Sequence, residues 1–286
     1  MKLKELFFMF GMKPAIKTFG HQLCKLDNPL GGAPLTWARW MHPKVAKLEP
    51  YFKDIPFLTR ILRPGDVAID IGAHVGDTTI PIGLVVGPTG LVIALEPNPA
   101  TFKILEINAA QNTALLNIHP VNAAAMDVDG NYEFHYNDPG LANGGYRKGF
   151  SIFQVPAFFT VNVKGINLPS YISQQFPDSL NRIRYIKTDC EGHDYEVFRG
   201  LKTLVNQARP FITMEIFDQV PLAEEKALIR ELQQMNYLAY KIKSLGDLQF
   251  SLIDLATHEK QKDNYDLLAV PQEKQGELFA STSSSQ

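Results

Sequence analysis

A glycine-containing loop followed at a distance by an acidic residue is the first feature of this chain that could do chemistry. The run Asp-Ile-Gly-Ala-His-Val-Gly occupies 70–76, and Glu96 follows 20 positions after Gly76. Glycines let the backbone approach a ligand closely. A carboxylate at this spacing can accept hydrogen bonds from both ribose hydroxyls of an adenosine. The pair therefore favours a nucleoside site over a simple turn and an unrelated surface carboxylate.

The other residues of this loop bear on which nucleoside is bound. A dinucleotide fingerprint, G-x-G-x-x-G, places a pyrophosphate on a helix N-terminus. Residues 72–79 read GAHVGDTT, which lacks the first glycine pair, and Asp77 would repel a pyrophosphate. S-adenosylmethionine carries an ammonium, a sulfonium and no phosphate, so the loop favours this cofactor over NAD. A nicotinamide-dependent oxidoreductase on a related fold and a catalytically silent cofactor-binding protein remain the alternatives.

A second group of reactive residues lies in the run IKTDCEGHDYE at 186–196, with Glu215 further along. Carboxylates gathered at one place repel each other unless a cation, a proton or a donor intervenes, so Asp189 and Glu191 are predicted to be functional. His193 is the first candidate for a general base, because its ordinary pKa lies near neutral pH. Asp189 could instead orient it or act as the base. Alternatively, Asp189 and Glu215 could hold Mg²⁺, which would acidify a substrate hydroxyl.

The elements that position these residues are short apolar runs separated by segments with helical character. The alternation predicts a parallel, doubly wound sheet, in which ligands bind at the carboxyl ends of the strands. Asn98 followed by proline is typical of a helix start. The predicted strands are 67–71, 91–95, 118–123, 183–187 and 211–216, with 237–242 and 265–270 as closing strands.

The domain organisation follows from where this pattern begins and ends. Residues 1–60 are predicted to form a helical cap, 61–271 a Rossmann-like domain, and 272–286 a disordered polar tail. The first apolar run is too short to span a bilayer. The lysines beside it leave open a weak peripheral contact of the N-terminus with a membrane surface.

Four segments together resemble the FkbM family of S-adenosylmethionine-dependent methyltransferases. They are LRPGDVAIDIGAHVGDTTIPIG, VIALEPNP, IKTDCEGHDYEVFRGL and FITMEIF, and the likeness runs from about 62 to 270. The resemblance implies a class I methyltransferase fold, here with a mostly parallel seven-stranded sheet and an N-terminal helical extension. It also implies methyl transfer to oxygen, on a hydroxyl of a sugar, a glycan or a polyketide-type metabolite.

The resemblance also implies which residues contact the cofactor and which carry the chemistry. Asp189, Glu191 and His193 match the second motif of the family and are the predicted catalytic residues. Residues 165–170 depart from the family pattern, because they lack an aspartate that commonly precedes the fourth strand. The predicted cofactor contacts are Asp70, Gly72, His74, Gly76, Thr78, Glu96, Asn98, Asn122, Ala123 and Asp189.

The net charge and the cysteine content indicate which kinds of partner and which setting to expect. The net charge is −2, without the basic excess that a general nucleic-acid binder uses to displace phosphate counterions, so no nucleic-acid partner is expected. The two cysteines, Cys24 and Cys190, form no CxxC pair, and neither a disulfide framework nor a thiolate zinc site is indicated. We expect a reducing, cytoplasmic setting.

Overall fold

An eight-stranded sheet forms the centre of the computed structural model, which describes residues 16–136, 144–146 and 159–279. Its strand order is β13-β12-β14-β11-β10-β3-β4-β5, and only β14 and β13 run against the others. The predicted mostly parallel sheet is confirmed, but the count of seven was wrong because short β13 adds an edge strand. The strands are β3 (Val67–Ile71), β4 (Leu91–Leu95), β5 (Ile118–Val121), β10 (Ile183–Thr188), β11 (Phe211–Ile216), β12 (Tyr237–Ile242), β13 (Phe250–Leu252) and β14 (Tyr265–Pro271).

Helices cover both faces of this sheet, as expected for strands that are apolar on both sides. In β3, Val67 and Ile69 pack into the core cluster under α5, α6 and α7. Ala68 between them faces the cluster under α2, α3 and α8, which is the two-residue alternation of a strand. The helices are α2 (Ile55–Ile61), α3 (Thr79–Val86), α4 (Pro99–Ala110), α5 (Leu168–Gln175), η2 (Pro177–Arg182), α6 (Asp194–Ala208), α7 (Leu222–Gln234) and η3 (Leu245–Asp247).

The chain order of the strands marks where a ligand should bind. From β3 the chain proceeds to β4 and β5 on one side, and later returns to β10 on the other side of β3. Adjacent loops that leave in opposite directions open a crevice at this switch point. The crevice therefore lies between the carboxyl ends of β3 and β10, where both reactive groups of the sequence are found.

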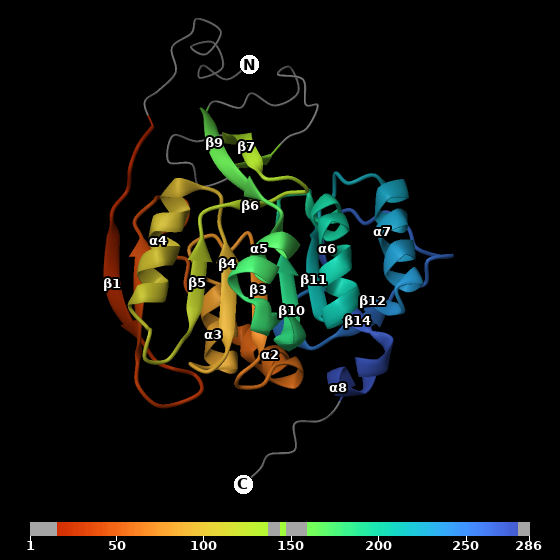
Figure 1. Ribbon diagram of the computed structural model, residues 1–286, viewed down its shortest axis with the longest axis horizontal. Coiled ribbons are helices and arrows are strands. Elements are labelled where there is room, and N and C mark those ends of the chain that lie inside the picture. Colours follow the sequence, from red (N-terminus) through yellow and green to blue (C-terminus); the bar gives the residue numbers. More distant parts are fainter. Residues whose placement is uncertain (1–15, 137–143, 147–158, 280–286) are drawn as a thin grey trace, which may run out of the picture.

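A small four-stranded sheet is inserted between β5 and β10. Its strand order is β6-β9-β7-β8, and Figure 1 shows β6, β7 and β9 above the carboxyl ends of the parallel strands. The inserted sheet therefore roofs the crevice. Its strands are β6 (Ala124–Ala125), β7 (Gly130–Tyr136), β8 (Gly144–Tyr146) and β9 (Phe159–Ile166).

The expected helical extension was wrong for much of the N-terminal region. β1 (His21–Leu26) and β2 (Leu35–Trp40) form an antiparallel hairpin, followed by η1 (Phe52–Asp54). The outer strand is largely exposed, whereas Trp37 of the inner strand is buried against the α4 side of the protein. Neither strand has the apolar alternation that would have revealed it. The predicted membrane contact falls on residues 1–15, outside the described residues.

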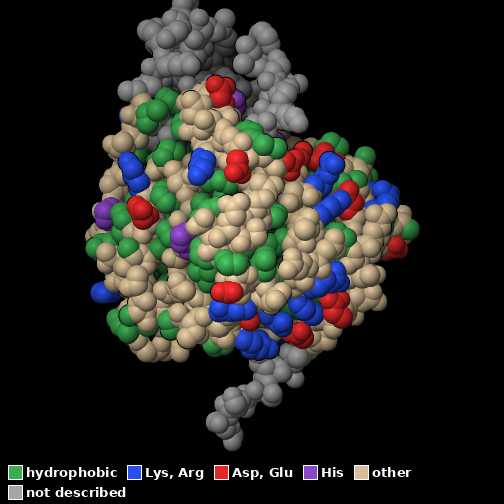
Figure 2. Space-filling model, viewed as in Figure 1, with side chains coloured by type: hydrophobic (Ala, Val, Ile, Leu, Met, Phe, Trp, Pro, Cys, Tyr) green, Lys and Arg blue, Asp and Glu red, His purple; other side chains and the backbone are tan. Residues whose placement is uncertain are grey.

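The predicted disordered tail was wrong for its first eight residues. η4 (Gln272–Lys274) and α8 (Gln275–Phe279) pack on the body of the protein, with Leu278 fully buried. Arg60 donates to the backbone oxygen of Leu278 at 3.0 Å. On the surface drawn in the lower part of Figure 2, basic and acidic side chains lie next to one another. Residues 280–286 lie outside the described residues.

Within the described ranges, no helix has both the length and the apolar character needed to cross a bilayer.

Candidate functional site

The loops that follow β3 and β10 touch each other at Gly72. The φ of Gly72 is +78°, and a Cβ added there would lie 2.0 Å from the backbone oxygen of Asp189. The amide of Asp189 in turn donates to the oxygen of Ile71 at 3.0 Å. No residue with a side chain fits this crossing, so glycine is required both for the dihedral and for the close approach.

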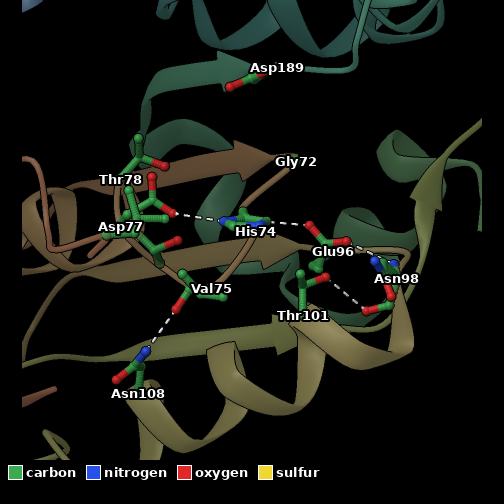
Figure 3. Close-up of polar contacts among 12 residues, drawn as sticks. Gly72, His74, Val75, Asp77, Thr78, Glu96, Asn98, Thr101, Asn108 and Asp189 are labelled. Carbon is green, nitrogen blue, oxygen red and sulfur yellow. Dashed lines mark hydrogen bonds and ion pairs between the residues drawn. The ribbon is translucent and has the colours of Figure 1, made fainter. Parts of the chain in front are cut away.

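Glu96, at the end of β4, holds the glycine loop from one side. Its carboxylate accepts the backbone N–H of His74 and that of Asn98, each at 2.8 Å (Figure 3). Burial raises its pKa, although these bonds and the charge of His74 oppose the effect. A carboxylate has four lone-pair sites, so two accepted bonds leave capacity for ligand hydroxyls.

His74 adopts a left-handed backbone conformation, with φ +50°. Its Nδ1 lies 3.4 Å from Oδ1 of Asp77, and its ring packs edge-on to Trp40 of the hairpin. Burial lowers the pKa of His74, but contact with Asp77 and the charge of Glu96 outweigh it and raise the pKa overall. A protonated His74 would thus sit between two carboxylates at the start of the loop.

Asn108 of α4 holds the same loop from below, a role that the sequence interpretation missed. Its Nδ2 donates to the oxygen of Val75 at 2.8 Å (Figure 3), and its Oδ1 accepts the N–H of Ala38 at 2.6 Å. Asn112, one turn further on, bonds only β2 and α4 and does not reach the loop. Two asparagines four residues apart on a buried helix face are the signal that could have revealed this clamp.

The loops enclose a pocket of about 530 Å³. Most of the predicted site residues line it, drawn from the loops after β3, β4, β5 and β10. Aromatic side chains of the roofing strand β7, which the sequence did not single out, form another wall. The predicted residues that line it are Gly72, His74, Glu96, Asn98, Ala123, Asp189, Glu191 and His193, and the aromatic residues are Tyr132, Phe134 and Tyr136.

Four predicted cofactor contacts lie outside this lining. Asp70 is fully buried and accepts the hydroxyls of Thr78 and Thr79 at 2.8 and 2.7 Å, which holds the start of α3. Gly76, with φ +97°, packs tightly on Leu105. Asn122 is exposed and donates to the backbone oxygens that follow β4. The fourth, Thr78, lines a separate, smaller pocket.

Lys187, on β10, is the cation among the carboxylates, and the sequence interpretation gave it no role. Its Nζ lies 3.3 Å from Oδ2 of Asp189 and 3.6 Å from Oδ1 of Asp70. Burial lowers the pKa of Lys187, but Asp189, Asp70 and Asp77 outweigh it and raise the pKa well above its ordinary value. The repulsion expected from the acidic motif is therefore offset by a buried ammonium group.

A proton offsets the rest of that repulsion. Burial, with the charge of Asp189, raises the pKa of Glu215 to about 8, and the two carboxyl groups share a hydrogen bond. Glu215 therefore holds the proton, and Asp189 remains charged. Glu215 lines neither described pocket. In the part of the chain that the structure describes, no three side chains of metal-ligating type form a cluster.

The residues of the second motif lie at the start of α6. Glu191 has φ +53°, and the amide of His193 bonds back to Cys190 at 3.2 Å, so the turn projects this motif over the pocket. Asp194 and Glu196 occupy the first turn of α6, where the helix dipole favours negative charge. Burial, with the charge of Asp189, raises the pKa of Asp194 to about 7.

Residues 165–170, which lack the aspartate that is common in the family, contain the start of α5. Asn167 caps α5, with its side chain accepting the N–H of Ser170 at 3.0 Å. The segment thus begins a helix with an amide instead of a carboxylate.

The order of the strands, the switch-point crevice and the acidic residue ending β4 define a nucleoside-binding fold of the class I methyltransferase type. The chain matches the methyltransferase FkbM domain over residues 70–241, more than half of its length. It belongs to the FkbM methyltransferase family, which confirms the resemblance seen in the sequence.

Several solved structures are similar to this chain. Methyltransferase FkbM from Methylobacillus flagellatus KT is 13% identical, with 80% of this chain and 50% of that one covered and a TM-score of 0.46. A SAM-dependent O-methyltransferase from Thermotoga maritima is 13% identical, with 76% and 64% covered and a TM-score of 0.38. M. jannaschii TYW2 in complex with AdoMet is 11% identical, with 88% and 85% covered and a TM-score of 0.40.

The chain thus spans half the length of the first of these proteins. A comparison with curated proteins finds no match. All three TM-scores lie below 0.5, so the family assignment rests on the matched domain.

Proposed function

We propose that this chain transfers a methyl group from S-adenosylmethionine to a hydroxyl oxygen of a sugar, a glycan or a polyketide-type metabolite. Membership of the FkbM family supports methyl transfer in general. The observation that carries the choice of cofactor is the acidic lining of the larger pocket, which includes Asp77, Glu96, Asp189 and Glu191. Carboxylates favour a ligand with cationic groups and disfavour a pyrophosphate.

The residues present fit this cofactor. Gly72 lines the pocket and lets the loops after β3 and β10 cross closely, and Glu96 can accept the two ribose hydroxyls while keeping its backbone donors. Ala123, which follows β5, is apolar and buried, and it suits the adenine side of the pocket. His74, Asn98 and Asp189 complete the set that would hold the cofactor.

The cofactor supplies an electrophilic methyl carbon on a sulfonium. The protein must align the hydroxyl oxygen with that carbon and remove the hydroxyl proton, because a neutral hydroxyl is a poor nucleophile. His193 is the base that we propose, since it lines the pocket beside Glu191 and histidine is the side chain that most often serves as a general base. Asp189, kept charged by Lys187, would orient the base or the hydroxyl.

Calorimetric titration with S-adenosylhomocysteine and with NAD tests the choice of cofactor. We expect the first ligand to bind and the second not to bind. Binding of NAD alone would instead indicate an oxidoreductase. Tight binding of S-adenosylhomocysteine, with no methylated product from any hydroxylated compound tested, would indicate a catalytically silent protein.

Replacement of the proposed base tests the chemistry, once a methylated product has been found. His193→Ala should lower kcat by about 10²–10⁴-fold, the usual contribution of a general base. Its affinity for S-adenosylhomocysteine should change little. His21→Ala, an exposed histidine on β1, is the matched control. Full turnover by His193→Ala would remove the histidine-base mechanism and leave Asp189 as the candidate.

A further inference from the structure

A second pocket of about 180 Å³ adjoins the larger one. The two share Tyr51, Lys187 and Asp189, so they meet at the carboxyl end of β10. The smaller pocket extends from there across the end of β11 to the start of β14. In FkbM-type chemistry as proposed above, a ligand in this pocket would lie directly beside the cofactor.

The smaller pocket contains a buried carboxylate oxygen without a partner. Asp54, in η1, lines the pocket and is 9% exposed, and its Oδ1 has no hydrogen-bond partner among the described residues. A buried polar atom left unpaired costs free energy, so sites with such an atom are completed by a donor from elsewhere. An O–H or N–H of a ligand that enters the pocket could supply this donor.

The other polar groups of this pocket are suited to hydroxyls. Asp266 of β14 lies half-buried in the wall, and burial raises its pKa to about 6. Thr213 of β11 is buried, with its hydroxyl 2.7 Å from that of Tyr185. Ser244 adds a further hydroxyl. Carboxylates and hydroxyls spaced around a small cavity provide donors and acceptors on several sides, as several ring hydroxyls require.

The two ends of the pocket differ in exposure. Asp54 and Thr213 are buried, whereas Lys53 and Lys243 are exposed and offset the acidic charge from the outer side. Tyr51, at the junction with the larger pocket, is 39% exposed, which leaves part of its ring accessible to a ligand. A ring-shaped ligand could therefore contact Tyr51 while its hydroxyls reach the buried carboxylates.

We infer that the smaller pocket is the subsite for the methyl acceptor, that it takes a polyhydroxylated ring, and that Asp54 selects this ligand by accepting a hydrogen bond from one of its hydroxyls. This inference rests on the proposed function. Another hydroxyl of the ring would face Asp189, at the boundary with the larger pocket. There a methyl group could be passed to it.

Calorimetry on the full chain saturated with S-adenosylhomocysteine tests this inference. The probes are methyl α-glucopyranoside, methyl α-mannopyranoside and myo-inositol. At least one should bind, and Asp54→Asn should weaken its binding at least tenfold while S-adenosylhomocysteine affinity changes less than twofold. Asp247→Asn is the matched control, because this exposed neighbour adds negative charge near Asp54 without lining the pocket. It should leave both affinities within twofold of the wild type.

A second variant keeps the test decisive if Asp54→Asn fails to fold. Ser244→Phe would fill the pocket from a half-exposed loop and should abolish binding of the ring, with S-adenosylhomocysteine still bound. Failure of every probe to bind the wild type would overturn the subsite. So would a tenfold loss of S-adenosylhomocysteine affinity in either variant, because the smaller pocket would then serve the cofactor. No binding of S-adenosylhomocysteine to the wild type would instead remove the proposed function itself.

Discussion

The carboxylates at the carboxyl ends of the parallel strands form two groups, one beside β3 and β4 and the other beside β10 and β11. The two groups are stabilised in different ways. Beside β3 and β4, Asp70 and Glu96 each accept two hydrogen bonds from the protein itself, and Asp70 also lies 3.6 Å from Lys187. Beside β10 and β11, Asp189 and Glu215 depend on one lysine and on a retained proton. The hydrogen bonds therefore hold the first group in place before any ligand arrives, although His74 titrates there with a raised pKa, whereas in the second group the carboxyl of Glu215 itself changes charge with pH. Binding of the cofactor and chemistry on the acceptor are thus expected to respond to different variables.

The two groups meet at Gly72, where the loops after β3 and β10 cross. Replacement of Gly72 should therefore have the largest effect on cofactor binding. Gly72→Ala places a Cβ 2.0 Å from the oxygen of Asp189, and the two loops must separate. We expect S-adenosylhomocysteine binding to fall beyond detection, measured by calorimetry. Gly87→Ala has the same kind of dihedral, φ +66°, with nothing within 4 Å of the added Cβ. It should cost about 1–3 kcal/mol of unfolding free energy from backbone strain alone and keep binding. Equal binding in both variants would contradict this account of the crossing.

The account of the first group can be tested with two asparagines, Asn108 of α4 and Asn112 just after its end. Asn108→Ala and Asn112→Ala should each lower the unfolding free energy by about 2 kcal/mol, because both leave buried backbone groups of β2 unpaired. Only Asn108 bonds the oxygen of Val75. Its loss should weaken S-adenosylhomocysteine binding about tenfold, whereas Asn112→Ala should change it less than twofold. An equal effect of the two on binding would mean that the clamp acts only on stability.

The pH dependence of the group beside β10 and β11 can be tested by measuring the unfolding free energy of a Glu215 variant at two pH values. Because burial raises its folded pKa from 4.5 to about 8, the folded state holds the proton more tightly than the unfolded chain. The resulting stability is present below pH 4.5 and is lost as pH rises through about 8. Glu215→Gln removes this term, so urea unfolding at pH 5 and pH 8 should show the variant gaining relative to the wild type at pH 8. Glu259→Gln, an exposed carboxylate, should change the profile less. A constant difference between Glu215→Gln and wild type would contradict the proton on Glu215.

The smallest effect is expected from chelation. Asp189 is paired with Lys187, and Glu215 holds a proton, so the charge repulsion between the two carboxyl groups is already offset without a metal ion. Treatment with EDTA, followed by transfer assays with and without added Mg²⁺, should therefore leave turnover within twofold. A loss of activity restored by Mg²⁺ would show that these two carboxylates hold a metal ion during turnover.

The sequence predicted the central sheet and the glycine loop well because both depend on local patterns. Seven strands were placed from their apolar runs, and Glu96 from its distance to Gly76. The full set of site residues could not be predicted from the sequence. Lys187 looks like an ordinary strand lysine until Asp70 and Asp189 are brought within 4 Å of it. Asp54 belongs to a segment with no family pattern, and only the fold places it beside β11 and β14.

The hairpin was missed for a related reason, because the contacts that attach it come from residues far away in the sequence. The bonds from Asn108 to Ala38 span 70 residues, and those from Asn112 to Thr36 span 76. Closing such a long loop costs chain entropy, which the contacts between the hairpin and α4 must offset. Asn108 bonds both Ala38 of the hairpin and Val75 of the glycine loop, so one side chain links the two segments. A ligand that needs the ordered loop would therefore slow hydrogen exchange at the amides of Thr36 and Ala38, far from any atom it touches.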